Sequence, residues 1–526
     1  MNNRNIMNKI ILFLLITPFA SFSQSKVSSE FIDSIVNVSM NKFPQAGVAI
    51  GVVQDGKITH LKGYGIASKN SETSVDENTL FAIASNSKAF TATALGILVD
   101  QGRINWEDKV IDHIPEFRMY DSYVTANFTI LDLLTHRSGL GLGAGDLMFF
   151  PDGADFTIDD IIASFQYQTP VSDFRTKYDY DNLLYMVAGE VVNRASGKSW
   201  DNFVQDEIMA KLGMNSSVGL YQNISDNLNV AFPHKTENNE IVEIGAYSNI
   251  DGGFGAAGGI YSNITDMSKW VQMHLNNGLY GDSLNDTLIS KSNHKELWKV
   301  HTNINSDPYG WGVYKSHYLG YGLGFLLQDQ GGYSVINHSG GLPGMLSMVT
   351  MIPELNAGII VLTNSAPGGL SLVTLTNEIK DEIIGAEEFD WLVWAEKRLA
   401  HSASEADSVV NAVWEQVEKS KKTKLDFNNY IGRYKDNWFG EVVVYEKDGV
   451  LWFKSLRSPK LEGKMKFYKA NTFAIAWEYQ DMDCDAFISF QLDENGNGTS
   501  ASMKGISPAI DFSFDFQDLD LIKIID

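Results

Sequence analysis

The sequence predicts an α+β protein, in which an antiparallel β-sheet is flanked by a helical region and followed by a small all-β, barrel-like domain. Two groups of strand-like segments lie far apart in the chain and enclose a long middle section with helical periodicity. A polar helical stretch then leads into a final section, where short strands alternate with turns. Strands on both sides of a helical insertion are typical of one sheet built from both chain ends, which is an α+β arrangement.

The strands of the predicted sheet are β-rich runs bounded by turn residues. Near the N-terminus, residues 46–53 and 57–64 flank the pair Asp55-Gly56, which favours a hairpin turn. Downstream, the turns 340–344 and 353–356 separate three more strands, predicted at residues 333–337, 345–352 and 358–362. We expect these strands to join the N-terminal hairpin in one antiparallel sheet.

Three helices are predicted in the middle section from apolar periodicity and end signals. The first runs from about Ser85 to Asp100, and Gly102 stops it. The second runs from Asn182 to Ala195 and ends at Gly197. The third follows residues 262–265, which are rich in helix-capping side chains.

The chain divides into two domains on this pattern. Residues 24–386 contain the predicted sheet and its helices. Residues 387–424 form a polar helical linker, and residues 425–526 carry short strands at turn-bounded intervals. We expect the last section to fold as a separate all-β domain, either a small barrel or a sandwich.

The first residues predict a secretory signal peptide at 1–23. Arg4 and Lys9 precede a short apolar run, and small residues follow it up to a cleavage point before Gln24. The apolar run is too short to span a bilayer, which requires about 20 residues. We therefore expect a protein exported to the periplasm or the medium, without stable membrane insertion.

Composition excludes several function classes. The 526 residues are 44% hydrophobic, which suits two or more packed cores and rules out a disordered chain. The net charge is −24 and no basic stripe is visible, so we expect no nucleic-acid partner. Cys484 is the single cysteine, which excludes an intrachain disulfide and a cysteine zinc cluster.

The strongest chemical signal is the segment Ser85-Asn86-Ser87-Lys88 at the start of a predicted helix. Residues three apart share one face of a helix, so Ser85 and Lys88 lie one turn apart. A serine hydroxyl is a weak nucleophile until a base removes its proton, and a lysine kept neutral by burial can act as that base. The spacing alone is common by chance, because a capping serine followed by a surface lysine gives the same pattern.

Two further segments supply partners for this pair. Tyr180-Asp181-Asn182 precedes a helix, where side chains two apart in a turn can project in the same direction. His338-Ser339-Gly340-Gly341 ends a predicted strand, where small residues let a substrate lie against the strand. The three segments in this order are specific for one type of serine chemistry.

With these motifs the chain resembles the serine β-lactamase and penicillin-binding protein superfamily. It is most similar to the class C β-lactamase-like branch that includes esterases and D-aminopeptidases, and its C-terminal section is similar to the lipocalin-like domain that often follows. The likeness covers residues from about 30 to 385 and also rests on these segments: Thr129 to Leu140, Ala257 to Asp266, Tyr321 to Phe325, and Val361 to Asn364.

The resemblance implies a role for each motif residue. Ser85 attacks a carbonyl group and forms an acyl-enzyme, while Lys88 and Tyr180 share the work of general base and acid. Asn182 contacts the substrate or orients Lys88, and His338 assists Tyr180 and the substrate. The backbone N–H groups of Ser85 and Gly341 form an oxyanion hole, with Gly340 on the same substrate strand. No metal or cofactor is implied.

The substrate class stays open on the sequence. Many β-lactamases have Lys-Thr-Gly where this chain has His338-Ser339-Gly340, and a histidine favours a substrate carboxylate less than a lysine does. We expect a hydrolase acting on an ester or amide of a small molecule or peptide. The alternatives are a cell-wall D-aminopeptidase or DD-carboxypeptidase, a β-lactamase, and a catalytically silent ligand-binding protein. A homo-oligomer is an open alternative for the quaternary state.

Overall fold

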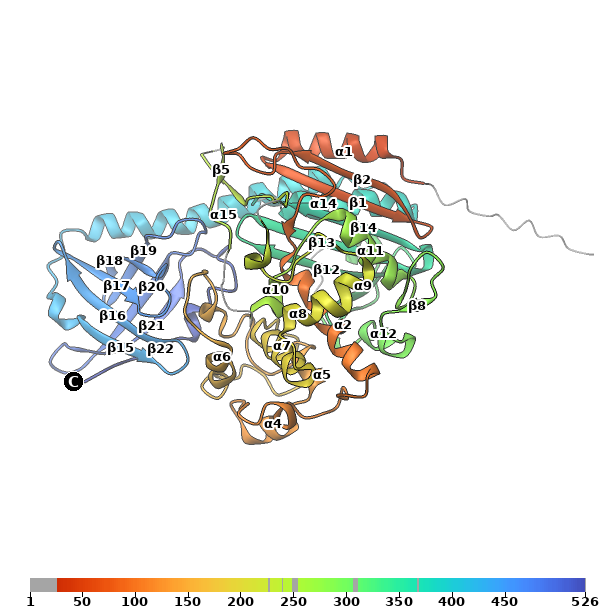
Figure 1. Ribbon diagram of the computed structural model, residues 1–526. Helices are drawn as coiled ribbons and strands as arrows, with labels where there is room; N and C mark the ends of the chain where they lie inside the picture. Colours follow the sequence, from red (N-terminus) through yellow and green to blue (C-terminus); the bar gives the residue numbers. More distant parts are fainter. Residues whose placement is uncertain are drawn as a thin grey trace, which may run out of the picture.

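A computed structural model describes residues 26–225, 228–238, 240–247, 254–305, 311–366 and 369–525. The predicted signal peptide at 1–23 lies outside the described residues. The predicted α+β class is confirmed: a large antiparallel sheet with helices is followed by a closed β-barrel (Figure 1). We call these two parts the sheet domain and the barrel. Among the described residues, none of the helices combines the length and the apolar character that crossing a membrane requires.

The main sheet has eight strands in the order β2-β1-β14-β13-β12-β11-β10-β9. Strands from both ends of the sheet domain are therefore neighbours in the sheet, where β1 pairs with β14 and places Ile50 opposite Val361. The strands are β1 Gly47–Gln54, β2 Lys57–Gly65, β9 Thr302–Asn303, β10 Leu319–Tyr321, β11 Leu326–Gln330, β12 Tyr333–Leu342, β13 Met345–Ile352 and β14 Ala357–Thr363.

Helices cover both faces of this sheet. Alternate residues of β1 point to opposite faces, so Ile50 packs with α1 (Ser29–Lys42) and α14 (Gly369–Ile384). Val53, on the other face, belongs to the core that contains α11 (Ile264–Leu275). The remaining helices of the sheet domain are α2 Ser87–Asp100, α3 Val110–His113, α4 Ser122–Asn127, α5 Ile130–Leu133, α6 Ile158–Ser164, α7 Leu183–Ser196, α8 Trp200–Val204, α9 Ala210–Leu212, α10 Gly255–Gly258, α12 Lys291–Leu297 and α13 Trp311–Tyr314.

Strand β12 is longer than the sequence predicts. We expected a strand at 333–337 followed by a glycine-rich turn, but β12 continues to Leu342, and Gly340 and Gly341 pair with Ser347 and Leu346 of β13. The glycines therefore do not form a turn. They keep the strand narrow where another backbone segment approaches it, which is a recognised use of glycine within strands. His338 consequently lies inside the strand and not at its end.

The barrel is a closed, eight-stranded antiparallel structure joined to the sheet domain by the long helix α15 (Trp391–Ser420) (Figure 1). Val413 and Val417 of α15 pack against Ala474 and Ile506 of the barrel. The barrel strands are β15 Gly432–Asp436, β16 Gly440–Lys447, β17 Val450–Ser455, β18 Glu462–Lys469, β19 Thr472–Trp477, β20 Ala486–Leu492, β21 Gly498–Gly505 and β22 Asp520–Lys523.

A second contact fixes the barrel directly on the sheet domain. Arg457 of the β17–β18 connection forms ion pairs with Asp155 and Asp160, and its guanidinium group lies 4.0 Å from the ring centroid of Phe156. Lys460 forms another ion pair with Asp152 at 2.6 Å. The barrel is therefore held at the loop between α5 and α6, which also borders the candidate site described below.

The packing of α11 on strand β14 of the main sheet can be tested by substitution. A methyl group added at Gly358 of β14 would lie 2.3 Å from Cγ1 of Val271 in α11. We predict that Gly358→Ala lowers the free energy of unfolding by about 1–3 kcal/mol, as overpacked cores do. Chemical denaturation followed by circular dichroism measures the change. Gly245→Ala is the matched control, because its added methyl group meets no atom within 4 Å. Equal stability of the two variants would contradict the described packing of α11 on β14.

Candidate active site

Ser85 lies in a strained turn directly before α2. The short 3₁₀ helix Ala84–Asn86 carries it, and Ala84 has a positive φ of 46°, which is uncommon for a residue other than glycine. The side chain of Ser347 in β13 holds the turn, since its Oγ donates to the carbonyl oxygen of Ile83 at 2.6 Å and accepts from Nδ2 of Asn86 at 2.8 Å. Strained backbone of this kind gathers at functional sites, and here it presents a partly exposed serine.

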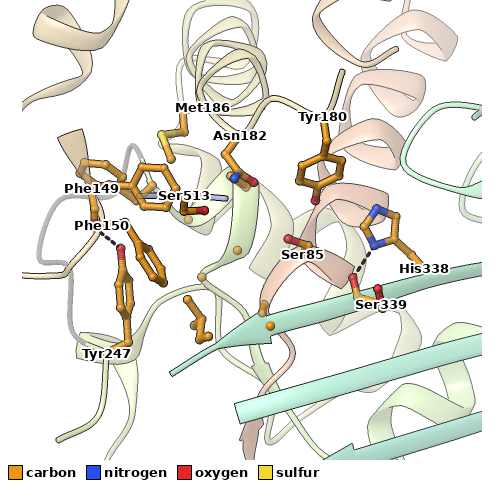
Figure 2. A pocket seen from close by; sticks show the side chains of 18 of the residues that line it. Ser85, Phe149, Phe150, Tyr180, Asn182, Met186, Tyr247, His338, Ser339 and Ser513 are labelled. Carbon is orange, nitrogen blue, oxygen red and sulfur yellow. Dashed lines mark hydrogen bonds between the residues drawn. The ribbon is translucent and has the colours of Figure 1, made fainter. Parts of the chain in front are cut away.

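Gly340 permits the close approach of strand β12 to this turn. A Cβ atom at residue 340 would lie 2.1 Å from the carbonyl oxygen of Ile83 and 2.9 Å from the backbone nitrogen of Ser85. A side chain there would push the strand away from the serine. Ser339 and Gly341, on either side, both line the cavity next to Ser85. Figure 2 shows Ser339 on its strand below Ser85. The glycine therefore sets the distance between the serine and the strand.

Lys88 lies one helical turn after Ser85 and has no exposed surface. Its Nζ is 3.2 Å from Oγ of Ser85, 2.7 Å from Oδ1 of Asn182 and 2.8 Å from the carbonyl oxygen of Ala257 in α10. Burial lowers the pKa of Lys88 to about 7, although the negative charges of Asp146 and Asp181 act in the opposite direction. Near neutral pH a large fraction of this amine is therefore uncharged.

In its neutral form, the amine of Lys88 directs its lone pair toward Ser85. An uncharged amine has two N–H groups to donate and one lone pair with which to accept. Asn182 and Ala257 provide two oxygen acceptors, which suit the two N–H groups. The lone pair is then left facing the hydroxyl group of Ser85 at 3.2 Å. This arrangement can remove the serine proton, and it depends on both acceptors staying in place.

Asn182 precedes α7 and is held by both ends of its amide group. Its Oδ1 accepts from Lys88 at 2.7 Å, and its Nδ2 donates to Oδ2 of Asp146 at 2.8 Å. Oδ2 of Asp146 thus fixes which end of the amide faces the lysine, because it accepts from the amide nitrogen. Burial raises the pKa of this carboxyl group well above its usual value. Asp146 begins a short 3₁₀ helix, Asp146–Met148, between α5 and α6. It was not predicted from the sequence, because no motif marks it.

Tyr180 points its hydroxyl group toward Ser85 (Figure 2). The Nζ of Lys88 lies 4.8 Å from the ring centroid of Tyr180, so this ring also borders the amine. Burial raises the pKa of Tyr180 well above its usual value, although a hydrogen bond with Ser85 acts in the opposite direction. The phenol is therefore protonated at neutral pH and can donate a hydrogen bond to an atom near Ser85.

His338 contacts Tyr321, the backbone of Ser339 and the ring of Tyr180. Its Nε2 lies 3.0 Å from the hydroxyl group of Tyr321, its Nδ1 lies 2.6 Å from the carbonyl oxygen of Ser339, and its ring centroid is 6.3 Å from that of Tyr180. Burial, followed by the charge of Lys88, lowers the pKa of His338 to about 3. The ring is neutral at physiological pH, with Nδ1–H donating to Ser339 and Nε2 accepting from Tyr321. Tyr321 lies in β10, and the sequence alone assigns it no role.

Ser85, Tyr180, Asn182 and His338 border one cavity of about 580 Å³, within the size range of pockets for drug-sized ligands. Aromatic rings line much of its wall, among them Phe149, Phe150 and Tyr247 in Figure 2. The barrel contributes Asp511, Phe512 and Ser513 to the wall. The aromatic residues that line it are Phe149, Phe150, Tyr178, Tyr180, Tyr221, Tyr247, Phe254, Tyr261, Tyr321 and Phe512. The cavity is therefore mainly apolar, with polar atoms gathered around Ser85.

Charge is sparse in this cavity. None of the described residues that line it is a lysine or an arginine, Lys88 being buried behind the wall, and Asp511 is the acidic residue among them. His338 adds no positive charge because its ring is neutral. Nor do the described residues contain a group of three or more histidine, cysteine or acidic side chains placed to hold a metal ion.

Comparison with known proteins agrees with the predicted family resemblance and with the fold. Residues 36–380 match the Beta-lactamase family, and residues 416–523 match a domain of unknown function (DUF3471). "Unguisins hydrolase ungD'" of Aspergillus campestris (strain IBT 28561) is 27% identical over 383 residues, 69% of this chain and 67% of that protein. "Penicillin-binding protein 4" of Amycolatopsis lactamdurans is 25% identical over 343 residues, 64% of this chain and 86% of that protein.

A solved structure is similar over both parts of the chain. The "octameric penicillin-binding protein homologue from Pyrococcus abyssi" superposes with a TM-score of 0.59 at 19% identity, covering 94% of this chain and 99% of that one. At this identity the likeness concerns the fold. It extends across the sheet domain and the barrel, because the matched share includes nearly all of this chain.

The pKa of Lys88 gives a direct prediction for the reactivity of Ser85. If neutral Lys88 removes the serine proton, the rate of labelling by a fluorophosphonate falls about tenfold per pH unit below pH 7 and levels off above it. Time-resolved intact mass between pH 5 and 9 measures this rate. Because burial also raises the pKa of Asp181 to about 7, Lys88→Ala assigns the transition. A labelling rate that keeps the same midpoint in Lys88→Ala would contradict the assignment to Lys88.

Proposed function

The chain belongs to the beta-lactamase family, and from this premise we propose that it is an exported serine hydrolase that cleaves an ester or amide through an acyl-enzyme on Ser85. The observation that carries the proposal is the fully buried amine of Lys88, 3.2 Å from Oγ of Ser85, with a pKa of about 7. Export rests on the signal pattern at residues 1–23.

The first half of the reaction forms the acyl-enzyme. Oγ of Ser85 attacks the carbonyl carbon of the substrate while its proton passes to the neutral amine of Lys88. The oxyanion of the tetrahedral intermediate is stabilised by the backbone N–H groups of Ser85 and Gly341, two residues that line the cavity. The bond to the leaving group then breaks, and the leaving group departs with a proton relayed from Lys88 through Tyr180.

The second half returns the enzyme to its starting state. A water molecule attacks the acyl carbon and passes its proton toward Lys88, and the bond between the acyl carbon and Oγ breaks. Ser85 regains a proton, and the carboxylic acid product leaves. Tyr180 serves both halves as a hydrogen-bond donor, because burial keeps its phenol protonated.

The lining of the cavity favours substrates with an apolar acyl group and no carboxylate next to the scissile bond. Aromatic rings line much of the wall, and the described residues that line it include no lysine or arginine to neutralise an anion. An unpaired carboxylate in such a site would carry a large desolvation cost. A penicillin or a peptide with a free C-terminus at this position fits poorly, which places esters and neutral amides first.

The names of the relatives leave penicillin recognition open as a second candidate function. The name "Penicillin-binding protein 4" describes the recognition of penicillin by that relative, whereas "Unguisins hydrolase" describes a hydrolytic activity. A catalytically silent binding protein remains the alternative from a different class. Mass spectrometry separates these alternatives, because it shows which reagent forms an adduct on Ser85 and whether any adduct forms at all.

We predict that the wild-type protein gains one fluorophosphonate adduct and turns over a p-nitrophenyl ester, and that Ser85→Ala does neither. Removing a catalytic nucleophile leaves only weak residual catalysis, on the order of a 10³-fold loss or more. Intact mass spectrometry and ester hydrolysis measure the two results, and the same spectrum shows whether the exported protein begins at Gln24. Ester turnover at the wild-type rate in Ser85→Ala would refute the proposal, and tight ligand binding without an adduct would favour the silent binding protein.

The preference against a carboxylate can be tested with a matched pair of reagents. We predict that the methyl ester of a penicillin acylates Ser85 at least tenfold faster than the free acid, because only the acid places an anion in the apolar cavity. His338→Lys should narrow this ratio by supplying a cation on β12. Stopped-flow kinetics measures the acylation rates of the methyl ester and the free acid. A free acid that reacts faster than its ester would show that the site does recognise a carboxylate.

A further inference from the structure

A loop of the barrel reaches the catalytic machinery of the sheet domain. This loop, residues 506–519, connects β21 to β22, and we call it the barrel loop. Oγ of Ser513 donates to Oδ2 of Asp146 at 2.8 Å. The two carboxylate oxygens of Asp515 accept from the backbone N–H groups of Gly145 and Leu147, at 2.7 and 2.9 Å. The barrel loop thus holds Asp146 by its side chain and by the backbone on either side of it.

These contacts are buried, so water does not replace them. Asp146 and Asp515 have no exposed surface, and Ser513 is 5% exposed. Buried hydrogen bonds to a carboxyl group are among the stronger ones in proteins, and losing one partner leaves a polar atom unsatisfied. Phe512 has a different role in the same loop, because it is partly exposed and its ring packs edge-on to Tyr180 at 5.9 Å between centroids.

The same carboxylate oxygen that accepts from Ser513 also accepts from Nδ2 of Asn182 at 2.8 Å. That contact determines which end of the Asn182 amide faces Lys88. If the amide rotated by half a turn, its NH₂ group would face the N–H groups of Lys88, and the amine would lose an acceptor. The lone pair of Lys88 would then no longer be fixed toward Ser85.

We propose that Ser513 and Asp515 of the barrel are positioning residues for Lys88, acting through Asp146 and the amide of Asn182. The barrel is then part of the catalytic machinery, although these two side chains bond to Asp146 and its neighbouring backbone and not to Ser85 or Lys88. This inference rests on the proposed role of Lys88 as the base that activates Ser85. It predicts that removing a single hydroxyl group on the barrel slows the reaction of Ser85 with a reagent too small to need the cavity wall.

The test compares Ser513→Ala with Ser502→Ala, a substitution of an exposed serine on barrel strand β21. The readout is the rate at which a small fluorophosphonate labels Ser85, measured from pH 5 to 9 on the full chain. We expect labelling about tenfold slower in Ser513→Ala, the size of effect expected from loss of one hydrogen bond to a carboxylate. We also expect the midpoint of the pH profile to move to lower pH, because the charged form of Lys88 loses an acceptor. Ser502→Ala should match the wild type.

The groups that face Lys88 determine how this pH profile is read. They come from several elements, and a shift in the midpoint could report any of them: Ser85, His136, Asp146, Tyr180, Asp181, Asn182, Tyr185 and His338. Because the side chain of Ser513 donates its hydrogen bond to Asp146, the variant perturbs that neighbour of Lys88 directly.

A double-mutant cycle separates positioning from a general loss of structure. Ser513→Ala, Asp146→Ala and the double variant are compared by labelling rate, with thermal unfolding as a check on folding. If Ser513 acts through Asp146, the double variant is no slower than Asp146→Ala; independent effects would multiply. If Asp146→Ala does not fold, the rate and the pH midpoint of Ser513→Ala alone decide the question.

The outcomes distinguish this inference from the proposed function. A wild-type protein that is not labelled at Ser85 would overturn the proposed function and this inference with it. A wild-type protein that is labelled, together with Ser513→Ala labelled at the same rate and with the same midpoint, would overturn this inference alone. A loss confined to KM for bulky esters, with unchanged labelling, would likewise contradict it and would make the barrel loop only a wall of the cavity.

Discussion

The burial of the Lys88 amine away from water is the constraint on which the rest of this site depends. Burial of Lys88 lowers its pKa to about 7 and makes a basic, uncharged amine available at neutral pH. Such an amine is useful only if its lone pair faces the serine, because its N–H groups would otherwise compete for the same hydroxyl. Two oxygen acceptors, on Asn182 and Ala257, satisfy the N–H groups and leave the lone pair directed at Ser85.

The surrounding fold can be understood from what these acceptors and the serine require. The central sheet places β12 and β13 against the turn that carries Ser85, and Gly340 makes the short distance between them achievable. Helix α10 supplies a backbone carbonyl, and the start of α7 supplies an amide whose direction is fixed by Asp146. The barrel closes the aromatic cavity and contacts Asp146 from outside the sheet domain. Ser85, Asn182 and Ala257, which are distant in sequence, thus converge on the amine of Lys88.

Much of this arrangement could be predicted from the sequence, where the relevant groups are side chains at short spacings. Ser85 and Lys88 lie one helical turn apart, and Tyr180 and Asn182 lie two residues apart before a helix, so local geometry brings each pair together. The predicted end of strand β12 was wrong because glycines usually indicate a turn. Gly340 is needed instead for the close approach of β12 to the turn that carries Ser85, which is a tertiary contact. The partner of His338 is Tyr321, on the second strand along the sheet from β12, a pairing that no local pattern encodes. The carbonyl of Ala257 has no side-chain signature, and Ser513 is 367 residues from Asp146.

The most direct test is the protonation of Lys88 itself. Carbon-13 NMR of protein labelled at the lysine ε position follows each amine through a pH titration, and the resonance missing from Lys88→Ala identifies the one in question. The assignment is needed because burial also lowers the pKa of Lys380 to about 7. We predict that the Lys88 resonance titrates near pH 7, well below the usual lysine pKa of 10.5. A Lys88 resonance that titrates near the usual lysine pKa of 10.5 would contradict the proposed chemistry, because Ser85 would then have no neutral base at physiological pH.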